Sequence, residues 1–292
     1  MSYSPTGTWN IVKKLQYVEE SAFGATPGSP AFVLAGHQVR MRESTETSAQ
    51  KYRELGSRDL YQMLKTGEMY SFELQYQPTS TALMRYGTEL PGGAGTTEKS
   101  LSFTYTQLIN AAETWYRYLG ARCDQLEVEV TEAAVKVMQR FLCKDIPAAV
   151  MADPFTTPGY AGADTSAPYT GASSGSNPLT INSNNYDVPR FKVSVDWNLE
   201  VIKPNGEMQA KFILPTNRDI SVEFDTWVKN DVLRADAKSL VARSASYVIA
   251  AGKQFTFTDL YLQRQGKSND AGDSKHMIET LAGTARSVTL TA

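Results

Sequence analysis

Alternation of apolar and polar residues over short segments is the dominant pattern of the chain. In residues 191–201 every second position is Phe, Val, Trp or Leu, and Lys, Ser, Asp, Asn and Glu stand between them. This period of two predicts a strand with one buried and one exposed face. A turn at residues 204–206 and a return strand over residues 207–214 complete a predicted hairpin. The side chains expected to be buried on the return strand are Met208, Ala210, Phe212 and Leu214.

Similar segments follow this hairpin. Residues 219–228, 253–264 and 285–292 alternate in the same way and predict strands. Between the first two, Val232, Leu233, Leu240 and Val241 fit one face of a helix. Asn230 or Asp231 would cap that helix.

The first half of the chain shows the same succession. Residues 36–55 can form a hairpin, 68–78 match the strand at 219–228, and 80–90 occupy the place of the helix. Residues 98–108 then match 252–262, and 116–131 match 278–292. The shared order predicts an internal duplication, which single-sequence matching of short strands leaves open.

The segment 150–188 separates the two halves. It is rich in Gly, Ser, Thr, Asn and Pro and poor in large aliphatic residues, so it predicts a linker or a long surface loop. The resulting division gives a first β domain with an N-terminal arm over residues 1–149, the linker, and a second β domain over residues 189–292. The fold class is therefore mainly β with short helices.

Both cysteines lie in residues 118–145, next to a cluster of carboxylates. Glu127 and Glu129 fall on one face of the predicted strand and apolar residues on the other, so the carboxylates are expected to be solvated rather than catalytic. The same reasoning covers Asp124 and Glu132. Cys123 and Cys143 are predicted to be a reduced, semi-buried pair, although their spacing also permits a disulfide.

Composition narrows the functional classes. The 292 residues carry 29 basic and 31 acidic side chains, a formal net charge of -2, so no basic surplus indicates an ordinary nucleic-acid binder. No apolar run reaches the roughly 20 residues that cross a bilayer, and no secretion signal is evident, so synthesis in a cytoplasm is expected.

The search for enzymatic motifs yields weak candidates. Ser173 lies in a G-x-S-x-G string, but the surrounding sequence is polar rather than the strand and helix that this motif requires. His37 and His276 lack partners with the spacing of a triad or a zinc site. The sequence therefore predicts no catalytic, cofactor-binding or metal-binding residue, no cofactor, and no enzyme.

The order of elements resembles that of the tail tube proteins of long-tailed bacteriophages, a family related to type VI secretion and contractile-tail tubes. The segments that carry the resemblance, each quoted from the sequence, are YVEESAFGATPGSPAF, KTGEMYSFELQYQPTSTALMRYG, GARCDQLEVEVTEAAVKVMQRF and NLEVIKPNGEMQAKFILPTNRDISVEFDTW. Simpler members of the family are shorter and lack a segment like 150–188.

The resemblance implies a β-sandwich or rolled sheet whose hairpins join those of neighbouring subunits in a barrel around a channel. It predicts a virion protein of the tail, assembled in the host cytoplasm, through which DNA passes. On this interpretation polar residues of the hairpins face the lumen. The candidates in the second half are Ser194, Asp196, Asn198, Glu200, Gln209 and Lys211. Those in the first half are Gln38, Arg40 and Arg42.

The implied partners are further copies of the chain, in rings stacked head to tail, with the tape measure protein and double-stranded DNA transiently in the lumen. Tail terminator and tail tip proteins would bind the tube ends, and no membrane is involved. A real duplication predicts three chains per ring, and its absence predicts six. An alternative is a tail-associated receptor- or carbohydrate-binding β-sandwich, for which residues 114–120, Tyr160 and Tyr169 offer aromatic material.

Overall fold

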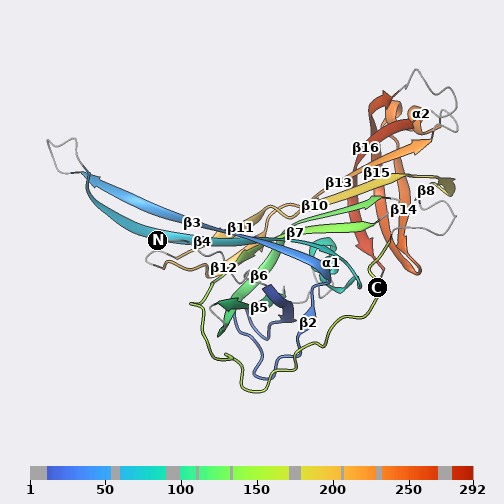
Figure 1. Ribbon diagram of the computed structural model, residues 1–292. Helices are drawn as coiled ribbons and strands as arrows, with labels where there is room; N and C mark the ends of the chain where they lie inside the picture. The colour runs from blue at the N-terminus through green and yellow to red at the C-terminus, as the bar shows by residue number, and fades with distance from the viewer. Residues whose placement is uncertain are drawn as a thin grey trace, which may run out of the picture.

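A computed structural model gives the fold of the chain. It describes residues 12–53, 60–89, 99–109, 112–131, 134–170, 179–204, 207–227, 232–268 and 278–291. These residues form antiparallel strands and two short helices (Figure 1). The mainly β fold class is therefore confirmed.

Among the described residues of the first half of the chain there are seven strands and one helix. They are β1 (Val12–Glu19), β2 (Val33–Leu34), β3 (His37–Arg53), β4 (Leu60–Gln77), α1 (Ala82–Thr88), β5 (Leu101–Ile109), β6 (Ala112–Thr131) and β7 (Val135–Cys143). Figure 1 shows the long β3–β4 hairpin projecting well beyond the rest of the molecule.

The second half contains the remaining strands and the second helix. They are β8 (Leu179–Ile181), β9 (Asn184–Tyr186), β10 (Arg190–Asp196), β11 (Leu199–Ile202), β12 (Phe212–Pro215), β13 (Asp219–Trp227), α2 (Val232–Ser239), β14 (Ala242–Ala250), β15 (Lys253–Ser268) and β16 (Ile278–Leu290). All except β11 and β12, which pair with each other, belong to one large sheet.

The two halves have the same strand order. In the first half the neighbours run β2-β1-β5-β6-β7-β4-β3, and in the second half they run β9-β8-β14-β15-β16-β13-β10. The helices also correspond, because α1 begins five residues after the end of β4 and α2 five residues after the end of β13. We call the two sets the first and second repeat.

This strand order corrects the alignment that sequence matching suggested. The counterpart of β5 is β14, and the counterpart of β6 is β15, because β5 and β14 both follow the helix and pair with the strand after them. The similarity of their sequence patterns instead matches β5 with β15 and β6 with β16, which is wrong. The second repeat begins at Leu179, inside the segment predicted as a linker, and the division into two domains stays a prediction.

One strand pair joins the repeats. The second half of β6 pairs with β10 in register from Thr131 opposite Arg190 to Gln125 opposite Asp196. The first half of β6 pairs with β5 along the same edge. We call the β6–β10 pair the seam, and it makes the sheet continuous from β3 through β7, β6 and β10 to β15.

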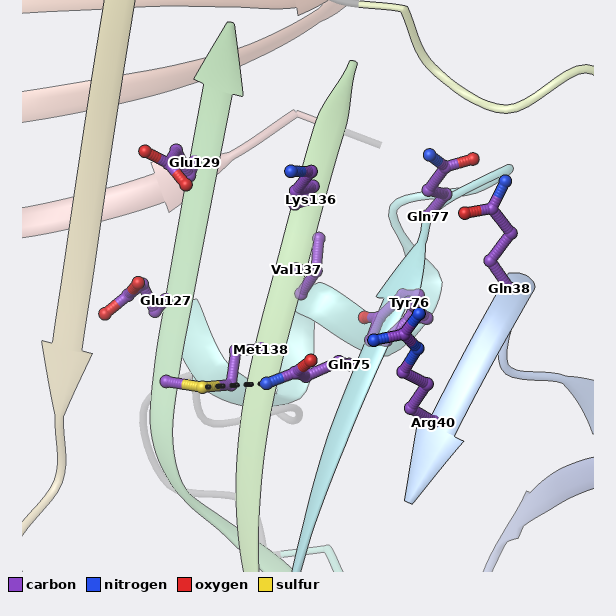
Figure 2. A pocket seen from close by; sticks show the side chains of 10 residues that line it. All are labelled: Gln38, Arg40, Gln75, Tyr76, Gln77, Glu127, Glu129, Lys136, Val137 and Met138. Atoms are coloured by element: carbon purple, nitrogen blue, oxygen red, sulfur yellow. Dashed lines mark hydrogen bonds between the residues drawn. The ribbon is translucent and has the colours of Figure 1, made fainter. Parts of the chain in front are cut away.

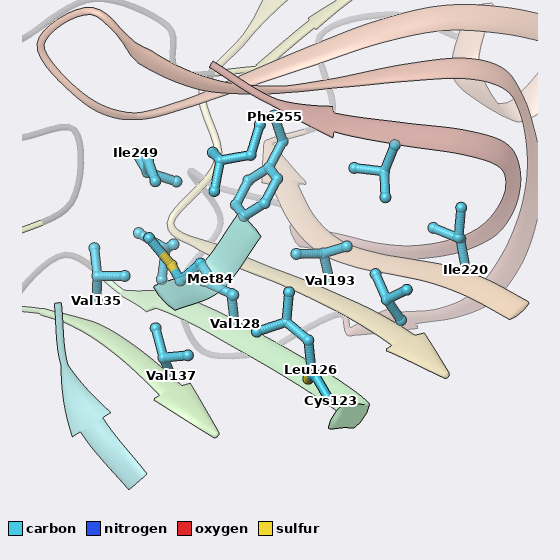
Figure 3. Packing of buried hydrophobic residues seen from close by; sticks show 14 of the residues in the cluster. Met84, Cys123, Leu126, Val128, Val135, Val137, Val193, Ile220, Ile249 and Phe255 are labelled. Carbon is cyan, nitrogen blue, oxygen red and sulfur yellow. The ribbon is translucent and has the colours of Figure 1, made fainter. Parts of the chain in front are cut away.

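The apolar core lies on one side of this continuous sheet. Val128, Val193 and Val222 lie opposite one another on β6, β10 and β13, and each is at most 1% exposed. Helix α1 covers the same side, and its Met84 reaches the valines of β6 and β7 as well as Phe255 (Figure 3). Gly87 allows this close approach, since a Cβ there would lie 2.6 Å from the Cβ of Leu126.

The predicted hairpin of residues 191–214 is only partly correct. The first strand ends at Asp196 and a new one starts at Leu199, because Asn198 adopts a φ of 47° that turns the chain. The return strand is confined to β12. Ala210 and Ile213 are buried there, whereas Met208, Phe212 and Leu214 are exposed, so the predicted burial of those three is wrong.

Three further secondary-structure predictions are wrong in part. Residues 37–53 form one long strand paired with β4 rather than a hairpin of their own. Helix α2 ends at Ser239, and Leu240, at φ 49°, lies beyond it. The proposed caps Asn230 and Asp231 lie outside the described residues. The predicted linker contains the β8–β9 pair, which extends the edge of β14.

Candidate channel-lining face

The side of the sheet opposite the core is polar across both repeats. Directly paired residues share a face of a sheet, so the registers define this surface. Its side chains are exposed or half-buried. We call it the polar face, and its members are Arg40 and Arg42 on β3, Glu73, Gln75 and Gln77 on β4, Lys136, Met138 and Arg140 on β7, Gln125, Glu127 and Glu129 on β6, Arg190, Lys192, Ser194 and Asp196 on β10, and Asp219, Ser221, Glu223 and Asp225 on β13.

Charges of both signs neutralise one another at the seam. The Arg190 guanidinium donates to Glu129 Oε1 at 3.0 Å and to Glu223 Oε1 at 2.7 Å. The hydrogen bond to Glu129 raises the pKa of Arg190. Lys192 Nζ lies 2.9 Å from Glu127 Oε2. Because these groups are about a third exposed, each pair stabilises the fold only slightly, by up to ~1 kcal/mol. Their main consequence is electrostatic, because the cations at the seam are already paired with carboxylates.

The polar face is hollowed beside the seam. Figure 2 shows side chains of β3, β4, β7 and β6 around an open hollow of about 380 Å³. Gln38 and Arg40 stand on one side of it and Glu127 and Glu129 on the other, and Gln75 Nε2 lies 3.9 Å from the Met138 sulfur. The hollow is lined mainly by long polar side chains, which suits a hydrated surface better than a small-molecule pocket.

The structure brings five of the candidate lumen residues together on this side of the sheet. Ser194 and Asp196 belong to the polar face, and so do Arg40 and Arg42 of the other repeat. Gln38 lines the same hollow.

The remaining candidates lie elsewhere. Asn198 sits at the end of the polar face, where its amide donates to Asp219 Oδ2 at 3.1 Å. Glu200 is on β11, outside the main sheet. Gln209 and Lys211 are exposed in the irregular segment before β12. These three share no strand with the polar face.

Asp124 anchors the bend that ends β10. Its Oδ1 accepts the Leu199 N–H at 3.0 Å, and its backbone oxygen accepts the Trp197 N–H at 2.8 Å. Burial raises the pKa of this carboxyl, and the bond from Leu199 opposes that shift. The Trp197 indole donates to the Gly87 oxygen at 2.7 Å, which ties the bend to α1. Asp124 is 7% exposed, so the expectation that it is solvated is wrong, and its carboxyl instead holds the bend in place. Glu132 lies outside the described residues.

The other chemical candidates show no assembled site. His37 Nε2 lies 2.9 Å from the Ser166 oxygen in an exposed position, and Ser173 and His276 lie outside the described residues. Tyr160 stacks on Phe32 and Trp115 rather than standing free on a loop. Within the described ranges no cluster of His, Cys, Asp or Glu is arranged to hold a metal. No described helix has the length and apolar character needed to span a membrane.

Both cysteines are free thiols, as predicted, and are buried more fully than expected. Cys123 is 7% exposed and Cys143 3% exposed. Burial raises the pKa of Cys123 to about 12 and also raises that of Cys143.

A thiol reagent is therefore expected to leave the native protein unlabelled at pH 8. Neutral, buried thiols are poor nucleophiles. After unfolding in denaturant both thiols should react with Ellman's reagent, two per chain. Rapid labelling of the native protein would contradict the burial of this region.

The fold and its polar face define the class of protein. A mainly β chain with open strand edges, a long projecting hairpin and a polar face with paired charges at its seam is suited to pairing with further chains. A family model described as phage tail tube protein matches residues 12–285. The chain belongs to the phage tail tube protein family, as its sequence resemblance predicted. A search of curated proteins found no match.

Family membership makes the chain a structural component of the bacteriophage tail tube and places it in the virion tail. Its assembly with further copies of itself and with other tail components follows from the same membership.

The seam between β6 and β10 could not be predicted from the sequence. Pairing between strands that lie so far apart in the chain leaves no local pattern of residues.

Proposed function

We propose that the chain forms rings that stack into the tail tube and that the polar face lines the channel through which DNA passes. The observation that carries this proposal is the continuity of the polar face across both repeats. A channel wall needs water-compatible side chains toward the lumen and apolar ones toward the outer layer, and the sheet separates the two in this way.

The charges of the polar face suit the passage of DNA. Phosphate binding strengthens with each available cation and depends steeply on salt. On this face the cations Arg190 and Lys192 are engaged by the carboxylates Glu127, Glu129 and Glu223. At the seam, a wall of this kind offers duplex DNA few unpaired cations, which favours sliding over tight binding.

Three chains per ring is the stoichiometry that the repeated strand order favours. Each chain supplies two repeats, which are already joined by one seam. Three chains would then supply six repeats. The two-domain organisation predicted from the sequence is part of this proposal.

Electron microscopy with mass photometry of the purified protein tests the proposal. Hollow rings or tubes are expected, with a smallest closed ring of three times the 32.2 kDa chain mass. A ring of six times that mass would contradict the three-chain arrangement only. A particle that stays at the mass of one chain at high concentration would contradict the tube itself and favour the receptor-binding alternative.

A further inference from the structure

The open strand edges of the described sheet include those of β3 and of one half of β15. Strand β3 pairs with β4 on one side only. Strand β15 pairs with β14 from Lys253 to Tyr261, and beyond that point it pairs only with β16. Long open edges of this kind are ready templates for another strand.

The seam shows which strands should meet. Inside the chain the edge strand of the second repeat, β10, pairs with the second half of β6. By strand order the counterpart of β10 is β3, and the counterpart of β6 is β15. The halves of the two strands correspond as well. In β6 the first half pairs with β5 and the second half forms the seam, and in β15 the first half pairs with β14. The open second half of β15 is therefore the counterpart of the half of β6 that forms the seam.

Resting on the proposed ring, we infer that β3 of one chain pairs antiparallel with residues 262–268 of β15 in a second copy. This intermolecular pair repeats the seam and closes the ring. The partner is therefore another copy of this chain, held by backbone hydrogen bonds.

The ladders also fix the register. Helices α1 and α2 begin the same number of residues after β4 and β13, so Glu73 on β4 corresponds to Glu223 on β13. Glu73 lies opposite Arg42 on β3, and Glu223 lies opposite Lys192 on β10, so Arg42 corresponds to Lys192. The row Gln125–Arg140–Glu73 then corresponds to Gln263–Ala282–Glu223.

In the seam, Asp196 lies opposite Gln125. Met69 on β4 corresponds to Asp219 on β13, because each lies four residues before the matched glutamate. Asp196 lies opposite Asp219 and Glu46 lies opposite Met69, so Glu46 is the counterpart of Asp196 on β3. The inferred contact therefore sets Glu46 opposite Gln263 of the second copy. Both side chains are exposed in the single chain, so neither has to leave a packed position.

The edge strands of the two repeats, β3 and β10, carry cations at corresponding positions. Arg40 and Arg42 occupy on β3 the positions that Arg190 and Lys192 occupy on β10. In the seam, these cations bind carboxylates of the neighbouring strands. The outer edge of β3 thus carries the same pair of cations to the proposed contact.

A disulfide between Glu46→Cys and Gln263→Cys tests the pairing. Within one chain these positions lie on strands separated by six others, roughly 30 Å apart at the usual strand spacing, too far for a bond that needs Cα atoms within ~7 Å. Oxidation of assembled protein should therefore link different chains. The expected product on a non-reducing gel is a closed trimer that contains most of the protein.

Matched variants control for chance contact. Glu46→Cys with Thr256→Cys keeps two exposed sites on the same two strands, but Thr256 lies where β14 already occupies the edge of β15. This variant should not cross-link. A mixture of the two single variants, Glu46→Cys and Gln263→Cys, should give dimers and nothing larger.

The outcomes separate the interface from the ring. Rings seen by electron microscopy without cross-linking would overturn the β3–β15 contact and leave the proposed function in place. Equal cross-linking through Thr256 would overturn the register. A closed species of six chains would support the contact and overturn the three-chain ring. Protein that forms neither rings nor cross-links would contradict both the contact and the proposed function.

Discussion

Replacing Phe191 by alanine is expected to lower the free energy of unfolding by about 3–5 kcal/mol, the usual cost of truncating a buried aromatic side chain. Phe191 is 0% exposed and stacks on Tyr247 of β14 with ring centroids 3.7 Å apart. It also belongs to the seam, where it lies opposite Val130. Its loss leaves a cavity between the two repeats. Urea unfolding followed by tryptophan fluorescence measures the change.

Phe212→Ala is the matched control for this experiment. Phe212 is also a phenylalanine on a short strand, but it is 47% exposed. Its truncation should cost within about 0.5 kcal/mol, as for other surface substitutions. Equal losses in the two variants would contradict the burial of Phe191 at the seam.

Adding cations to the polar face is expected to make assembled tubes bind duplex DNA. Glu73→Lys with Asp219→Lys places two new lysines in every chain, on strands of both repeats. Repeated around a ring, they offer at least six phosphate contacts, for which affinity falls by about a thousandfold or more between 50 and 200 mM salt. Fluorescence anisotropy of a labelled duplex with tubes of the variant and the parent protein measures the difference.

The neutral variant Glu73→Gln with Asp219→Asn separates added positive charge from lost negative charge. It should bind DNA much more weakly than the lysine variant. Strong, salt-dependent binding by the parent tubes would contradict the proposed neutral wall. No gain in the lysine variant, with tubes still formed, would mean that the polar face does not line a space that DNA can enter.

The strands that lie within the sheet were predictable from the sequence. Leu126, Val128 and Val130 are buried and Glu127 and Glu129 lie on the polar face, as the alternation required. A strand with a core on one side and water on the other imposes a period of two, so the pattern fixes both the element and its orientation. Five of the nine candidate lumen residues came to lie on the same side of the sheet for this reason.

The errors arose where the period is interrupted. Asn198 takes a positive φ, which Asn tolerates better than most residues, and this bends the chain after β10. Beyond it, irregular residues shift the register, so Ile213 rather than Phe212 is buried. The mismatched alignment of β5 has a related cause. Residues 101–109 and 253–261 have similar patterns, and only strand pairing distinguishes their places.

The two repeats differ most in their hairpins. In the first repeat, β3 and β4 continue as a long arm (Figure 1), whereas in the second the chain bends at Asn198 and the short β11–β12 hairpin lies beside that arm, where Lys203 Nζ donates to the Glu68 backbone oxygen. A ring of six repeats would therefore carry three long arms alternating with three short hairpins. Such a ring has threefold rather than sixfold rotational symmetry at its rim. Two stacked rings of threefold symmetry have three equivalent relative orientations, whereas rings of six identical units have six. The alternation of arms and hairpins within each ring can therefore specify the rotation between successive rings.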